Sequence, residues 1–517
     1  MLRKSIVTLL VIAIFMLCAC APVALQAAQS DPTPSPSQSI VVNTATPTAS
    51  PIETTAPAQQ EPYPKYIFIF IGDGMGVNQK TISQSFLQYI SGDDTATLQL
   101  NSMNVNASVS TYSANADITD SAASATALAT GVKTNNAMIS VTPDETELRT
   151  LLEAVQDIGY ATGIVTTTRI THATPACFYA HNTHRSNESE IALELLNSDI
   201  DFIAGGGLKF FLPLTLPEPY ASFAPDVRNF EIVSTRTDER NLVDEFADKG
   251  YEIYLGPDGS TQLMAYSPAA GDKVFAPLTY NYFPYEIDRL NRFGALPSLS
   301  DLTQKAIDLL SLDDDGFFLM VEGGRIDYAG HNNDVMSIIY DTLAFDDAVQ
   351  TAIAFYLAHP EDTLIITTSD HETGGLTLDA DIDYLTLFDG VYDISASYGD
   401  GYGMLYEPRI GISEYVDALN AMGIINLTDG ERSKLRRALR ADEEIEYKDD
   451  YIDTLTSLAV NAIINARLGV SWSTDYHTGV NVDLGVTGIF EERFADAVDN
   501  TDIANILADI LDVDIGP

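Results

Sequence analysis

A serine preceded by an aspartate opens a stretch of small side chains. Residues 117–133 read DITDSAASATALATGVK, so Asp120 stands directly before Ser121. A helix that begins near Ser121 would point free amide groups and the positive end of its dipole at whatever lies before it. A serine there could act as a nucleophile if a metal ion activated its hydroxyl. A buried alanine-rich helix without chemistry would fit the same residues, so this stretch alone does not decide.

Carboxylates and imidazoles follow four apolar runs, at the point where each run ends. These candidate metal ligands are Asp73, His172, Thr174, Glu322, Asp327, His331, Asp370 and His371, and the late motif DYHTGVN adds His477. In open α/β sheets, ligands bind outside the carboxyl ends of the strands, so we expect these side chains to meet in one crevice.

The residue types in this predicted crevice suit Zn²⁺, which prefers imidazole and carboxylate ligands. Asp327 and His331 are four residues apart, which lets both reach one ion. Asp370 and His371 are adjacent and could serve a second ion. A solvated loop would explain any single pair, but four such clusters after apolar runs favour a metal centre.

The apolar runs alternate with helix-like segments such as 147–159 and 335–358. Near-continuous apolar strands indicate a sheet covered on both faces, and the alternation with helices is the α/β pattern. We therefore predict a three-layer α/β/α sandwich with a large, mostly parallel central sheet. Residues 212–300 and 379–470 fit the alternation poorly, and we interpret them as insertions on the rim, although a small separate lid domain would also fit.

The N-terminal residues have the features of an export signal. A basic start is followed by an apolar run and by LCAC, which resembles a bacterial lipobox. We predict a lipoprotein signal peptide over 1–19 and a lipidated Cys20, with an ordinary cut near LQAAQ as the alternative. Residues 20–64, rich in Pro, Ser and Thr, read as an extended spacer before a catalytic domain over 65–517. The protein would then be exported and anchored to the outer face of a membrane.

Charge and cysteine content limit the possible partners and cross-links. The 517-residue chain has a formal net charge of −47, which argues against nucleic-acid binding because phosphate backbones attract Lys and Arg. Such acidity is also compatible with adaptation to salt. Beyond the predicted signal and Cys20, Cys177 is the remaining cysteine, so an internal disulfide is excluded and the domain must rely on its core and on metals.

Six motifs together resemble the alkaline phosphatase family, in that family's order and across most of 66–488. They are GDGMG (72–76), TDSAASATALATGVKT (119–134), THATPA (171–176), VEGGRID (321–327), TSDHETGG (368–375) and HTG (477–479). The resemblance implies hydrolysis of small phosphate monoesters with two Zn²⁺ and one Mg²⁺. It also suggests a homodimer.

The resemblance further implies roles for single residues. Ser121 would be the nucleophile that forms a phosphoserine, Arg185 would hold two phosphate oxygens, and Asp120 would orient Arg185. The implied ligands are Asp327, His331 and His477 for the first zinc; Asp73, Asp370 and His371 for the second; and Asp73, Thr174 and Glu322 for magnesium.

Two positions depart from the best-known bacterial members of the family. His172 stands where those enzymes carry Asp, and Tyr328 stands where they carry Lys. His172 could touch the third ion directly or through water, so the identity of that ion stays open. Because a neutral imidazole attracts a hard cation less than a carboxylate does, we expect a weaker and less selective third site.

Two other functions remain as alternatives. A phosphodiesterase could use the same scaffold, but such enzymes usually lack the arginine that grips phosphate, whereas Arg185 is present. A sulfatase would need a C/S-x-P-x-R motif, which does not occur. A lipoprotein that only binds metal or phosphate would have no need of a nucleophile at Ser121.

Overall fold

A nine-stranded sheet runs through the computed structural model, which describes residues 63–517 apart from 216–233, 235, 400, 402–404, 406–409 and 446–453. The strand order is β2-β13-β8-β1-β7-β3-β4-β6-β5. The strands are β1 (Tyr66–Ile71), β2 (Val105–Val109), β3 (Ala161–Arg169), β4 (Phe202–Gly206), β5 (Tyr251–Ile253), β6 (Lys273–Pro277), β7 (Phe317–Glu322), β8 (Thr363–Thr368) and β13 (Val482–Gly488). Only the pairings of β13 with β2 and β8 are antiparallel among these strands, so the predicted mostly parallel sheet is confirmed.

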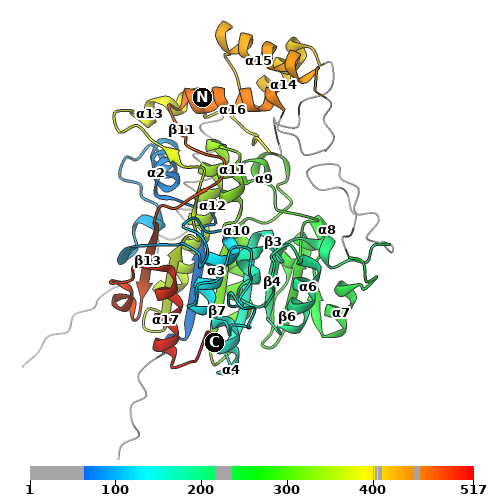
Figure 1. Ribbon diagram of the computed structural model, residues 1–517, viewed down its shortest axis with the longest axis vertical. Coiled ribbons are helices and arrows are strands. Elements are labelled where there is room, and N and C mark those ends of the chain that lie inside the picture. The colour runs from blue at the N-terminus through cyan, green and yellow to red at the C-terminus, as the bar shows by residue number, and fades with distance from the viewer. Residues whose placement is uncertain are drawn as a thin grey trace, which may run out of the picture. The chain divides into compact units, whose positions relative to one another are not determined.

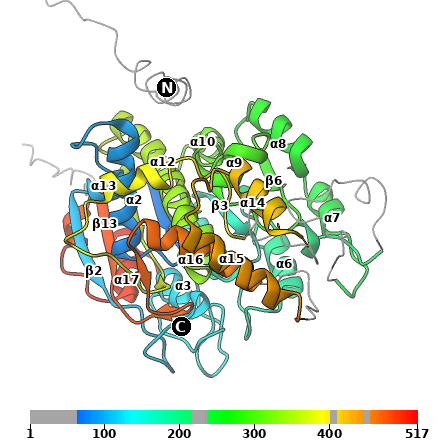
Figure 2. The same cartoon turned by 90° about the horizontal axis from the view of Figure 1, so that it is seen from above.

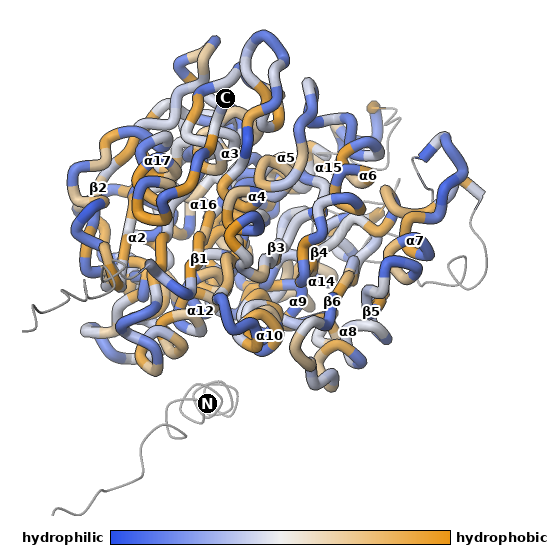
Figure 3. Tube along the Cα trace, turned by 90° about the horizontal axis from the view of Figure 1, so that it is seen from below, coloured by the Kyte–Doolittle hydropathy of each residue, from blue (hydrophilic) through white to orange (hydrophobic). Residues whose placement is uncertain are grey.

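Helices cover both faces of this sheet, as predicted (Figures 1 and 2). One face carries α2 (Val77–Ser91), α9 (Glu286–Arg292), α10 (Leu299–Leu310) and α12 (Val335–Ala358), and the other carries α3 (Ser121–Thr130), α4 (Leu151–Asp157), α6 (Glu188–Asn197), α7 (Leu242–Asp248) and α17 (Asn500–Leu511). The central strand β1 contributes side chains to the hydrophobic cores on both faces of the sheet. Its aromatic residues Tyr66, Phe68 and Phe70 face the first layer and its isoleucines face the second, because successive side chains point to opposite faces. Figure 3 shows hydrophobic residues along the strands.

The stretch 212–300, which we interpreted from the sequence as an insertion on the rim, also contributes strands to the central sheet. It supplies β5 and β6, which extend the central sheet beyond β4 in parallel pairings, with α8 (Gly256–Ala265) between them. The sequence pattern missed these strands because β5 has three residues and β6 ends at Pro277.

The described part of 379–470 forms a helical cap at one end of the molecule (Figure 1, yellow to orange). The cap contains α13 (Tyr384–Leu387), α14 (Ile412–Ala421), α15 (Asp429–Asp442) and α16 (Leu455–Arg467). Amide groups of α16 fix the cap to the domain below, since Asn461 Nδ2 donates to the Asn332 carbonyl at 2.7 Å and Asn465 Nδ2 to the Asn333 carbonyl at 2.9 Å.

The predicted signal peptide, Cys20 and the spacer up to residue 62 lie outside the described residues. Among the helices that the structure describes, none is long and apolar enough to span a membrane. Cys177 is buried and free, which agrees with the expectation that the domain has no internal disulfide.

Candidate metal centre and nucleophile

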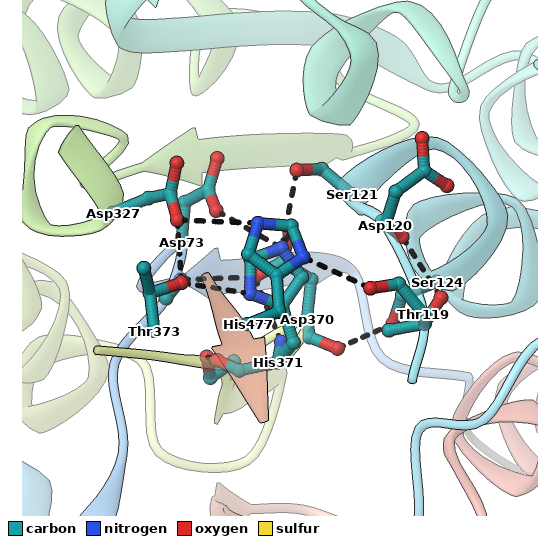
Figure 4. Close-up of polar contacts among 12 residues, drawn as sticks. Asp73, Thr119, Asp120, Ser121, Ser124, Asp327, Asp370, His371, Thr373 and His477 are labelled. Atoms are coloured by element: carbon teal, nitrogen blue, oxygen red, sulfur yellow. Dashed lines mark hydrogen bonds and ion pairs between the residues drawn. The ribbon is translucent and has the colours of Figure 1, made fainter. Parts of the chain in front are cut away.

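Ser121 is the first residue of α3, as the sequence predicted. Asp120 caps the helix, accepting a hydrogen bond from the Ala123 amide at 3.0 Å, and Gly131 ends it in the left-handed conformation. All ten residues of α3 are buried, which their small side chains allow. Ser121 is 1% exposed, and its Oγ lies 3.2 Å from His371 Nε2 (Figure 4).

The candidate ligands meet beyond the carboxyl ends of three neighbouring strands. Asp73 follows β1; Glu322 ends β7, and Asp327 and His331 follow it on α11 (Arg325–His331); Asp370 and His371 follow β8. The late residue His477 arrives on β12 (His477–Thr478), which pairs with β9 (Glu372–Thr373). These side chains therefore come together at one end of the sheet, as predicted, and we call the place where they meet the metal crevice. Figure 4 shows its central part.

The first cluster joins Asp327, His331 and His477. The Nε2 atoms of the two histidines lie 3.2 Å apart, and 3.4 and 3.7 Å from Asp327 Oδ1. Each Nδ1 faces a backbone carbonyl, that of Asp475 at 2.6 Å and that of Thr119 at 2.9 Å. A carbonyl can only accept, so both Nδ1 atoms carry hydrogen, and in the neutral rings both Nε2 atoms present lone pairs. Two facing lone pairs beside a carboxylate call for a cation between them.

The second cluster joins Asp73, Asp370 and His371. His371 Nε2 lies 3.6 Å from Asp73 Oδ1 and 3.3 Å from Asp370 Oδ2. Thr373 Oγ1 donates to Asp327 Oδ1 at 2.5 Å, so at its 3.2 Å contact with His371 Nδ1 it accepts. The hydrogen of His371 is thereby held on Nδ1, and its Nε2 lone pair faces the cluster and Ser121.

The third cluster joins Asp73, His172 and Glu322, whose ligand atoms lie within 4.8 Å of one another. Thr166 and Thr168 donate to Glu322 Oε2, the latter at 2.9 Å. His172 Nε2 lies 3.1 Å from an Nη2 of Arg185. Because guanidinium only donates, Nε2 accepts this bond, and in this arrangement it serves Arg185 rather than an ion.

Buried oxygen atoms without hydrogen-bond partners in the described part of the chain gather in these three clusters. Atoms with no hydrogen bond to any described residue include both carboxylate oxygens of Asp73, Asp370 Oδ2, Glu322 Oε1 and Thr174 Oγ1. His172 Nδ1 also has no partner among the described residues, but it carries the ring hydrogen when Nε2 accepts from Arg185, so it is not a metal ligand in this arrangement. Leaving buried polar groups unpaired costs free energy, and these are mostly the oxygen ligands that bind divalent cations. The side chains present therefore fit the two Zn²⁺ and the third ion that the sequence implied.

The raised pKa values of the carboxylates in these clusters also indicate that the clusters suit cations. Burial, followed by the charges of Asp370, Asp327 and Glu322, raises the pKa of Asp73 well above its usual value. Burial also raises the pKa of Glu322 and of Asp370 to about 7. So many carboxylates in one buried site repel one another unless cations are present.

Two of the candidate imidazole ligands, His371 and His172, are held neutral, as metal ligands must be. Burial lowers the pKa of His371 and of His172 well below the usual value, helped in His172 by Arg185 and Arg169. Burial opposes ionisation of Asp327, but positive charge at the neighbouring imidazole positions, that of His331 first, lowers its pKa to about 2. A cation bound between neutral rings would supply that charge.

Arg185 contacts Asp120, the residue that the family resemblance pairs with it. Its Nη1 donates to Asp120 Oδ2 at 3.0 Å, so Asp120 caps α3 with one oxygen and holds the arginine with the other. The Ala137 amide also donates to Oδ2, which fixes the carboxylate. The charged residue before Ser121 thus links the nucleophile's helix to the arginine.

Sequence reasoning missed two supporting residues, Thr373 and Glu372, although TSDHETGG contains both. Glu372 Oε1 accepts from Gln79 Nε2 at 2.6 Å and from the Gly375 amide at 2.9 Å. Its Oε2 accepts from the Thr478 hydroxyl, next to His477. Glu372 therefore fastens the strand that carries His477 to the strand after His371.

Comparisons with known proteins agree with this geometry. A family model described as alkaline phosphatase matches residues 64–513. Alkaline phosphatase 3 of Bacillus subtilis is 33% identical over 465 residues, covering 84% of this chain and 86% of that protein. Among solved structures, a cold-active alkaline phosphatase from Shewanella sp. matches with a TM-score of 0.71 at 30% identity, covering 86% of this chain and 99% of that one.

A second solved structure also matches this chain. It is a variant of the alkaline phosphatase from the Antarctic bacterium TAB5 in which a histidine is replaced by aspartate, with Mg bound in its M3 site. It matches with a TM-score of 0.59 at 27% identity, covering 88% of this chain and 100% of that one.

Proposed function

The chain belongs to the alkaline phosphatase family and has that family's phosphatase activity, and we propose that it hydrolyses phosphate monoesters through a phosphoserine formed at Ser121. The observation that carries this proposal is the position of Ser121 Oγ. It stands at the N-terminus of a buried helix, 3.2 Å from His371 Nε2, beside three clusters of metal-ligand side chains. A site that only bound metal or phosphate would not need a hydroxyl there.

The residues divide the reaction between them. Two Zn²⁺ and a third divalent ion, when bound by the three clusters, would supply positive charge and lower the pKa of the attacking hydroxyl and water. Ser121 Oγ attacks phosphorus in line with the leaving oxygen, which departs with the alcohol. Arg185, aimed by Asp120, holds two phosphate oxygens with its planar guanidinium. Water then cleaves the phosphoserine, which releases inorganic phosphate and restores Ser121.

The third site would take Mg²⁺, and more weakly than a site with a carboxylate at position 172. The hydrogen bond between Arg185 and His172 Nε2 supports this view, since a ring engaged there has less to offer an ion. The TAB5 variant with aspartate in place of a histidine and Mg in its M3 site also supports it, by analogy.

The test of the nucleophile is Ser121→Ala. After mixing with a phosphate monoester and quenching in acid, the parent should carry covalent phosphate at Ser121, and the variant should carry none while keeping its metals. Ser85→Ala, on α2 with its hydroxyl donating to the Thr81 carbonyl at 3.1 Å, is the matched control. Covalent phosphate retained by the Ser121 variant at the same peptide would refute the assignment.

A phosphodiesterase remains the second candidate, and Arg185 favours the monoesterase. A monoester has three terminal oxygens that share two negative charges, so two can bind the guanidinium while the third faces the metal clusters, whereas a diester has two terminal oxygens that share one charge. The ratio of kcat/KM for matched monoester and diester substrates should exceed one in the parent and fall in Arg185→Met. A ratio below one in the parent would favour the diesterase.

We also propose that the protein is exported and held at a membrane by a lipid on Cys20, and that it forms a homodimer. The motif LCAC and the following Pro/Thr-rich stretch support the anchor. Cys20→Ala should release active protein from membranes, and equal retention of parent and variant would rule out this anchor. Light scattering of the released protein would give its mass and test the dimer.

A further inference from the structure

The cap helix α15 carries an unusual concentration of positive charge. The chain has 27 Lys and Arg among 517 residues, yet five fall within nine consecutive positions of this helix. They are Arg432, Lys434, Arg436, Arg437 and Arg440, and all five are exposed. Leu435 and Leu439 form the buried side of the helix, and the five cations lie on its exposed side, between acidic residues at its start (Asp429, Glu431) and at its end (Asp442).

This basic face has no acidic partner in the described part of the chain. Lys434, Arg436, Arg437 and Arg440 make no ion pair with any residue that the structure describes. Arg436 and Arg440 are four residues apart, so their charges repel, at a cost of about 0.2–0.5 kcal/mol for such a pair. A chain with a net charge of −47 has many carboxylates that could have been placed among them.

Helix α15 is joined to the loop after His331 through one intervening helix, α16. α15 packs on α16, and α16 bonds through Asn461 to the carbonyls of Asn332 and Asn333, directly after His331. Figures 1 and 2 show α16 lying above α3, whose first residue is Ser121, with α15 beside α16. Anything bound to α15 is therefore one helix away from the loop that carries a candidate zinc ligand.

We propose that the basic face of α15 binds a soluble polyanion with many phosphate groups and holds it beside the crevice. The inference rests on the proposed function, because it names the class of substrate that this phosphatase would collect. The strongly negative chain repels anionic substrates, but salt screens charges beyond about 8–10 Å, so a local basic face can still attract them. Guanidinium groups match phosphate oxygens in pairs.

The composition of α15 favours a soluble polyanion over a membrane surface. A helix that lies on a membrane needs large apolar side chains to insert beside its basic ones. The large apolar residues of α15 are Leu435 and Leu439, and both are buried against the cap. The exposed arc offers charge alone.

The binding test uses labelled inorganic polyphosphate and the metal-loaded Ser121→Ala protein, with excess inorganic phosphate to fill the crevice. The triple variant Arg436→Gln, Arg437→Gln, Arg440→Gln should bind polyphosphate about tenfold more weakly at low salt. Gln keeps the helix, because its helix propensity is close to that of Arg. The matched control changes the ion-paired Arg149, Arg240 and Arg493 to Gln and should bind within about twofold of the parent.

The results separate this inference from the proposed function. Turnover of a small chromogenic monoester, measured with Ser121 intact, should be equal in the parent and the α15 triple variant. If the parent lacks that turnover, the proposed function fails while the binding result still stands. Equal polyphosphate affinity in the parent and the α15 variant would overturn the inference. So would α15-dependent binding to anionic phospholipid vesicles without binding to polyphosphate.

Discussion

The metal crevice and the basic face of α15 both leave charges without partners in the described chain, but they differ in burial. Asp73 in the crevice is fully buried, and neither of its carboxylate oxygens has a hydrogen bond to any residue that the structure describes. Arg436 on α15 is exposed, so water compensates its charge. An uncompensated buried charge is costly and an exposed one is not. The metal crevice therefore selects cations of a particular size and coordination geometry, whereas the basic face of α15 selects only for negative charge.

Removing the metals should have the largest effect on activity and on the free energy of unfolding. Chelation should abolish activity and destabilise the protein more as pH rises. Burial raises the pKa of Glu322 and of Asp370 to about 7, above their usual values near 4. The folded apo protein thus binds more protons than the unfolded chain, and this stability is lost as pH rises through about 7.

The measurement is the Tm of chelated and metal-reconstituted protein at pH 5 and pH 8. We expect the gap between the two forms to be at least about 5 °C wider at pH 8, because bound cations keep the carboxylates ionised without repulsion. Returning Zn²⁺ and Mg²⁺ should restore the Tm. A gap that is the same at both pH values would mean that these carboxylates do not depend on metals.

The difference between the position of a residue and the orientation of its side chain explains which features the sequence could predict. The order of the motifs and the apolar runs were sufficient to place Asp73, Glu322 and Asp370 at one end of the sheet, because parallel strands bring their carboxyl ends together. The tautomer of His371 was beyond the sequence, since it depends on the rotamer of Thr373. The strand β5 was missed because three residues are too few to show a pattern.

A second test concerns how the buried ligands are held. Thr373→Val keeps the shape but removes the hydroxyl that links His371 Nδ1 to Asp327 Oδ1. Both ligands would lose orientation, so we expect zinc affinity to fall about 10–100-fold. Thr373→Ser should stay near the parent. Zinc retained against a competing chelator gives the affinity independently of activity, and equal retention in all three proteins would assign no such role to Thr373.

The third cluster offers a smaller change within the same buried region. His172→Asp adds a negative charge beside Asp73 and Glu322, so Mg²⁺ should bind about tenfold more tightly and activity should depend more on Mg²⁺. Adding Tyr328→Lys should also strengthen inhibition by phosphate. Equilibrium dialysis of Mg²⁺ against parent, single and double variants is the measurement. An unchanged Mg²⁺ affinity in the single variant would show that position 172 does not govern the site.

The smallest effect is expected where a partly buried charge already has its partner. Burial opposes protonation of His181, but Glu153 Oε1 at 3.0 Å and the Ser140 carbonyl raise its pKa to about 9. A pKa raised above the unfolded value near 6.5 gives stability that is complete below pH 6.5 and is lost as pH rises through 9. The metal-loaded parent should therefore lose roughly 2 kcal/mol more unfolding free energy between pH 6.5 and 9 than His181→Gln does.

Glu153→Gln supplies the second arm of this last test, because it keeps the side-chain shape and leaves the imidazole without its carboxylate. Its pH dependence should be as flat as that of His181→Gln in denaturant titrations at the two pH values. Parallel behaviour of the parent and both variants would mean that the pair holds no extra proton. The expected loss of unfolding free energy is modest because Glu153 already neutralises the charge of His181 within the chain. The carboxylates of the metal crevice, in contrast, need bound metal ions to neutralise them.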